Sequence, residues 1–99
     1  MNKEQKKLLK RKYLNEQTRL HNIRCSNDYK KFKRDFGHLP KVKFFLNNIE
    51  KMVQECEINT PRVQIQGAVC IFYKKNNEII DVIPDERFLG VLYDLLSEP

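Results

Sequence analysis

Residues 41–56, KVKFFLNNIEKMVQEC, carry the most regular hydrophobic pattern of the 99-residue chain. Apolar side chains recur there at intervals of three and four residues, at Val42, Phe45, Leu46, Ile49, Met52, Val53 and Cys56. This spacing predicts an amphipathic helix that buries one side. Pro40 can open the helix because its missing N–H is not needed in a first turn, and Asn59-Thr60-Pro61 would follow its end.

The segment before this helix predicts a turn at residues 37–40 and a short helix over residues 28–36. Ser26 or Asn27 would cap the short helix, and Gly37 would take the left-handed conformation beyond its end. Its aromatic residues Tyr29, Phe32 and Phe36 share one stripe, which we expect in the core. The same packing would direct three cations outward, Lys30, Lys31 and Arg34.

Residues 3–24 contain neither Gly nor Pro and predict a first, long helix. Its apolar stripe is thin and consists of Leu9, Tyr13, Leu20 and Ile23. A different side carries Lys3, Lys6, Lys7 and Lys10. Because residues 1–10 have almost nothing to bury, we expect them to fray or stay disordered until a partner neutralises their charge.

The segment after residue 61 predicts β structure. Residues 62–74 are dense in β-branched and aromatic side chains and indicate a strand, with a bend at Gly67. Asn76-Asn77 would form a two-residue hairpin turn, because Asn tolerates positive φ, and would return the chain as residues 78–83. The hairpin tip would then be basic and polar.

Residues 87–96 predict a last helix, capped by Asp85. Apolar side chains cover more than half of its circumference, which one neighbouring layer cannot easily bury. Either the helix is enclosed by the hairpin and the preceding helix, or its spare side forms a homodimer.

These elements define an α+β fold with three N-terminal helices, one β-hairpin and one C-terminal helix. The length of 99 residues fits one domain, residues 1–99, and no second. Residues 1–43 hold 14 basic and 4 acidic side chains, whereas residues 44–99 hold 5 and 9. Such clustering attracts polyanions, although a well-solvated surface would show it too.

Catalysis and metal binding have little support in the sequence. His21 and Cys25 lie four residues apart, but with His38 and Cys56 they fit no zinc pattern. Nothing identifies a base for Cys25, and the three glycines form no phosphate-binding loop. We therefore expect no enzyme and no cofactor. Three widely spaced cysteines, no signal peptide and no stretch of about 18 apolar residues favour a cytoplasmic protein without a membrane contact.

Binding remains as the function class, and the predicted order of elements resembles a winged helix-turn-helix domain in layout, not in sequence motif. That resemblance implies a small nucleic-acid-binding regulator, of DNA or RNA, in which residues 41–56 read base edges and the hairpin contacts phosphates. The candidate nucleic-acid-binding residues are Lys6, Lys7, Lys10, Lys30, Lys31, Arg34, Lys43, Asn47, Lys51, Lys74 and Lys75.

Two alternatives stay open. Glu50, Glu55 and Glu57 bring negative charge to the supposed reading helix, so the leading helices could instead bind the nucleic-acid backbone without sequence preference. A rival from another class is a protein-interaction module, an adaptor or inhibitor of viral type, that docks on an acidic partner protein. Phe44, an aromatic on the polar side of its helix, would be its apolar anchor, although packing beneath a neighbouring segment would also explain it.

Overall fold

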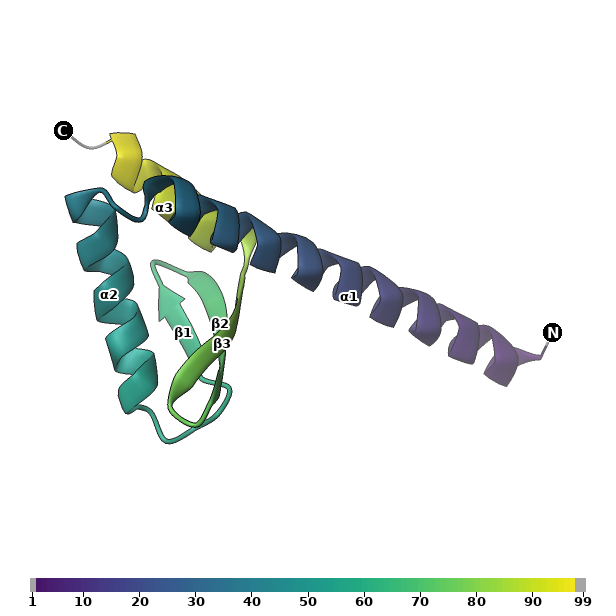
Figure 1. Ribbon diagram of the computed structural model, residues 1–99. Coiled ribbons are helices and arrows are strands. Elements are labelled where there is room, and N and C mark those ends of the chain that lie inside the picture. Colours follow the sequence, from purple (N-terminus) through teal and green to yellow (C-terminus); the bar gives the residue numbers. More distant parts are fainter. Residues whose placement is uncertain (1, 98–99) are drawn as a thin grey trace.

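The computed structural model describes residues 2–97 and shows an α+β fold (Figure 1). In chain order its elements are α1 (Lys3–Phe36), α2 (Pro40–Glu55), β1 (Arg62–Ile65), β2 (Ala68–Lys75), β3 (Glu78–Pro84) and α3 (Glu86–Ser97). The carboxyl-terminal part of α1 packs with the other elements, while its amino-terminal part projects as a rod away from the sheet. The predicted fold class is confirmed, but its detailed layout is not.

α1 is one continuous helix of 34 residues, so the prediction of two helices separated near Ser26 was wrong. Ser26 does not cap a helix start. Its hydroxyl instead donates a hydrogen bond to Asp81 of β3, at 2.5 Å, and so turns toward the sheet. With no Gly or Pro between residues 3 and 36, nothing in the local sequence forces a break.

The two ends of α1 are defined by different interactions. At the amino end Asn2 and Gln5 form a capping box, in which each side chain accepts a hydrogen bond from the other residue's backbone N–H. At the other end Gly37 has φ −65°, not the left-handed conformation expected from the sequence. A Cβ at Gly37 would lie 2.3 Å from the Lys33 carbonyl oxygen, so glycine is required for space.

The sheet is a three-stranded antiparallel meander in the order β1-β2-β3. The predicted single strand over residues 62–74 is two strands, because Gln66 and Gly67 have φ values of 51° and 78° and form a tight turn. Asn76 and Asn77, with φ 53° and 65°, make the second turn at the expected place. With two helices ahead of the sheet and three strands in it, the described residues do not confirm a winged-helix layout.

One face of the sheet forms the core with the helices. Ala68, Cys70 and Phe72 of β2 are fully buried on that face, together with Phe88 and Leu92 of α3. The aromatic stripe of residues 29–36 joins this core as predicted. The apolar surface of α3 is mostly covered within the chain, and dimerisation through α3 stays a prediction.

Candidate nucleic-acid interface

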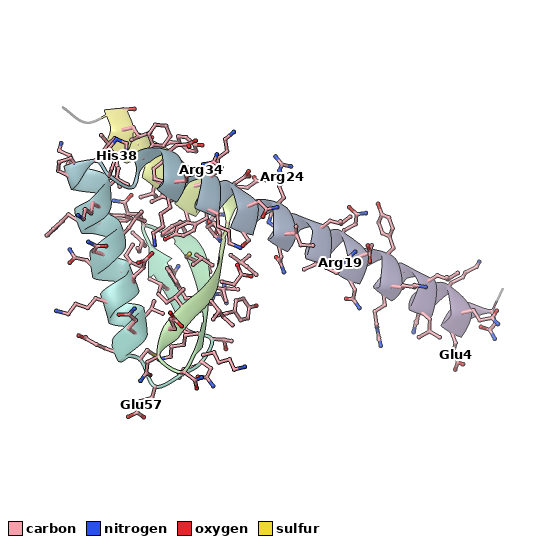
Figure 2. The ribbon with its side chains drawn as sticks, viewed as in Figure 1. Glu4, Arg19, Arg24, Arg34, His38 and Glu57 are labelled. Carbon is pink, nitrogen blue, oxygen red and sulfur yellow. The ribbon has the colours of Figure 1, made fainter. Side chains whose placement is uncertain are left out.

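The projecting part of α1, residues 3–24, is here called the arm. It holds eight basic and two acidic side chains, and all but one of its residues are exposed. Figure 2 shows its side chains ending in solvent, among them Glu4, Arg19 and Arg24. We predicted that the first turns of this helix fray. Fraying is a motion in solution, so it stays a prediction.

A basic stripe follows one side of α1. At 3.6 residues per turn, Lys3, Lys6 and Lys10 lie within a narrow arc, and Arg24 and Lys31 continue it because they follow Lys10 by multiples of seven residues. All five side chains are exposed and form no ion pair within the described part of the chain. From Lys3 to Lys31 the stripe is about 42 Å long at 1.5 Å per residue.

Other cations of α1 are partly neutralised by carboxylates. The Lys33 ammonium lies 2.6 Å from Glu50 of α2, and Lys30 lies 3.9 Å from Asp81. Arg34 contacts its neighbour Asp35 at 3.2 Å. Of the three predicted cations in this region, Lys31 therefore has the least compensated charge.

The predicted residues of α2 lie on a second, separate surface. Lys43, Asn47 and Lys51 follow one another at intervals of four on the exposed side of α2, as the periodicity predicts. Phe44 accompanies them and is 70% exposed, so it does not pack beneath another segment of residues 2–97. Figure 1 shows α2 beside the sheet at the carboxyl end of α1, whereas the arm projects from the other end, so the two basic surfaces lie apart.

Lys74 does not belong to the hairpin tip as predicted. Its side chain is only 6% exposed, and its ammonium donates a hydrogen bond to the Val53 carbonyl oxygen at the end of α2, at 3.3 Å. The negative end of the helix dipole stabilises a cation at this place. Lys75 is exposed at the tip but pairs in register with Glu78, so the tip carries little net charge.

Sequence reasoning missed two residues of the basic stripe as candidate contacts, Lys3 and Arg24. The signal was the seven-residue spacing of Lys3, Lys10, Arg24 and Lys31, with Gln17 at the intervening position. Lys3, Lys10 and Arg24 already lay within the helix predicted over residues 3–24, and the assumed break near Ser26 separated only Lys31 from them.

The sequence pattern singled out His21 and Cys25 as possible metal ligands and Cys25 as a possible nucleophile. His21 Nε2 lies 3.4 Å from Cys25 Sγ, but no group of three or more metal-ligating side chains occurs in residues 2–97. Burial raises the pKa of the Cys25 and Cys70 thiols, which favours the unreactive protonated form.

Comparison of the chain with protein families, with curated proteins and with solved structures finds no match. Among the helices described, none combines the length and the apolar character that crossing a bilayer requires.

Proposed function

We propose that the protein binds the phosphate backbone of nucleic acid, without sequence preference, through the basic stripe of α1. The observation that supports this proposal is the five exposed and unpaired cations along one side of a helix that extends beyond the folded body. Lysine and arginine that neutralise phosphates release condensed counterions, which drives binding of this kind.

The geometry favours backbone contact over base reading. The stripe is about as long as the rise of 12 base pairs, at 3.4 Å each, and its contacts would therefore be spread along the duplex. The α2 surface holds Asn47, a side chain able to address base edges, but only two cations accompany it there, Lys43 and Lys51. We therefore assign the affinity to α1 and give α2 no reading role.

The test is a fluorescence-anisotropy titration of random-sequence duplex DNA and of random-sequence RNA at about 50 mM salt. Nonspecific binders reach dissociation constants of about 10⁻⁴–10⁻⁶ M at physiological salt, so saturation by tens of micromolar protein is expected. Binding of several unrelated sequences with equal affinity supports the proposal. Absence of binding to both DNA and RNA contradicts it and favours the acidic protein partner.

A further inference from the structure

The sheet has two edge strands, β1 and β3, and the edge of β3 is protected (Figure 1). The Asp85 N–H donates to the Val69 carbonyl of β2, at 2.8 Å. Bonding alternates along an antiparallel pair, so the backbone of Val82 and Pro84 points outward. The Val82 N–H donates to the Asp81 carboxylate, at 2.9 Å, and Pro84 has no N–H. With α1 packed along β3 as well, this edge is closed to a further strand.

The edge of β1 has no such protection. The Phe72 N–H donates to the Pro61 carbonyl, at 3.1 Å, which sets the alternation between β1 and β2. The N–H and C=O groups of Arg62 and Gln64 therefore point away from β2. Within residues 2–97 no group bonds to them. We call these two donors and two acceptors the β1 edge, and they are the groups to which another strand adds.

A groove lies beside the β1 edge, between β1 and the end of α2. It has a volume of about 290 Å³ and is lined by residues 61–64 and by Met52, Val53 and Cys56. Met52 lies on the apolar side of α2, yet its side chain is 53% exposed. Within residues 2–97 the sheet ends at β1, so no strand covers Met52. The groove therefore lies where side chains of a fourth strand would pack.

The other side of the sheet offers a cation at the same edge. Side chains alternate along a strand, so Arg62 lies opposite the buried Val63. Arg62 is exposed and has no carboxylate partner among the residues described. Asp81, on that side of the sheet, is engaged by Ser26 and Lys30. A strand residue that pairs with Arg62 would therefore be favoured by a carboxylate.

A second copy of the chain does not supply these side chains. If two β1 edges pair antiparallel, Arg62 of one lies opposite Gln64 of the other, so no carboxylate reaches Arg62. The side chain that would face the groove is then Val63 of the copy. Val63 is only 9% exposed because it belongs to its own core, so it cannot also fill the groove. An extended segment of another protein can provide both side chains.

We infer that the β1 edge binds an extended segment of another protein, which adds to the sheet as a fourth strand. Its alternate residues place an apolar side chain against Met52 in the groove and a carboxylate beside Arg62. Lys51 and Glu55, which flank Met52 on α2, carry opposite charges and add no net charge there. The site shares no residue with the basic stripe of α1, so it goes beyond the proposed function and is tested separately.

The test is an amide NMR titration of the full chain with a short peptide in which valine and glutamate alternate. A peptide concentration of about 1 mM half-saturates a site whose dissociation constant is millimolar. The amide signals of Arg62 and Gln64 should shift. The matched peptide with lysine in place of glutamate should bind about threefold more weakly or worse. Unchanged signals at both amides would overturn the inference.

Methylation of the peptide backbone tests strand addition without any change to the protein. In an added strand every second N–H donates to the β1 edge, and the others point away from it. Two versions of the peptide carry N-methyl groups on one or the other alternate set of residues. One version should bind about tenfold more weakly or worse, and the other should keep most of its affinity. Equal effects of the two methylations would contradict strand addition.

The matched variants of the protein are Gln64→Pro and Gln64→Ala. Proline removes the N–H that belongs to the β1 edge and leaves the bonds between β1 and β2 in place. Gln64→Pro should bind the peptide about tenfold more weakly, whereas Gln64→Ala keeps the N–H and should bind as the unchanged protein does. Thermal unfolding shows whether both variants fold, and the methylated peptides decide the question if Gln64→Pro does not.

Sedimentation equilibrium of the full chain tests the other occupant of this edge. A monomer of 11.9 kDa is expected, because the β1 edge is free until a peptide binds. A dimer that Gln64→Pro dissociates would overturn the inference, since a second copy would then occupy the β1 edge.

Discussion

Ser26 of α1 and Asp81 of β3 are joined by a hydrogen bond of 2.5 Å across 55 residues of sequence. The same Asp81 oxygen accepts a bond from the Val82 N–H, at 2.9 Å, and lies 3.9 Å from the Lys30 ammonium. These contacts fix α1 to the sheet at the point beyond which the arm is exposed. They therefore determine the direction in which the basic stripe extends.

Replacing Ser26 by Ala should lower the free energy of unfolding by about 1.5 kcal/mol, because a hydrogen bond to a carboxylate is lost at a buried position. Chemical denaturation measures this change. Asn27→Ala, at an exposed neighbouring position, is the control and should be nearly neutral. If Ser26→Ala is as harmless as the control, the Ser26–Asp81 contact does not anchor α1.

Gly37→Ala should destabilise the protein by about 1–3 kcal/mol, because its Cβ would lie 2.3 Å from the rigid Lys33 carbonyl oxygen. The matched control is Gly90→Ala in α3, where a Cβ meets nothing within 4 Å. Alanine is preferred over glycine inside a helix, so Gly90→Ala should stabilise by about 0.5–1 kcal/mol. Thermal unfolding of both variants should show shifts of opposite sign, and shifts of the same sign would refute this explanation.

Lys74→Met should lower the free energy of unfolding by about 1 kcal/mol or more, because the bond from the ammonium to the Val53 carbonyl is lost. The affinity of the Lys74→Met variant for nucleic acid should equal that of the unchanged protein. Lys75→Met, at the neighbouring exposed position, should leave the stability unchanged. Denaturation and anisotropy on the same samples separate the two properties, and a loss of affinity with intact stability would restore Lys74 to the binding surface.

Reversing two charges of the stripe, in Lys6→Glu/Lys10→Glu, should weaken binding of every oligonucleotide by roughly tenfold or more. Lys51→Glu/Lys75→Glu makes the same change in net charge away from α1 and is the matched control. Its effect should be much smaller, because neither residue lies on the stripe. Equal losses for the two variants would show that affinity follows net charge, not the stripe.

Elements governed by local pattern were predictable from the sequence. The periodicity of residues 41–56 predicted α2 and its polar side, although Met52 of the expected apolar side is 53% exposed. Asn76-Asn77 marked a turn because both residues tolerate positive φ. The alternation of side chains along β2 also indicated that Lys74 is buried. Lys74 continues the alternation of Ala68, Cys70 and Phe72, and only its charge argued against placing it inside.

The remaining differences depend on contacts between distant segments. Ser26 is a common helix cap, and its actual partner, Asp81, lies too far along the chain for local reasoning to find. Gln66 is an uncommon turn residue, so the turn before Ala68 appeared only as a bend. The separation of the α1 and α2 surfaces follows from the packing of these helices around the sheet, which the sequence pattern does not specify.

The salt dependence of affinity for a random-sequence duplex tests the proposed function most directly. With five cations on phosphates, the logarithm of the association constant should fall linearly with the logarithm of the salt concentration, with a slope of about −4.5. Removing two of these charges in Lys6→Ala/Lys10→Ala should reduce the slope to about −2.7. An unchanged slope in this variant, or no binding at about 50 mM salt, would contradict a nucleic-acid interface on α1.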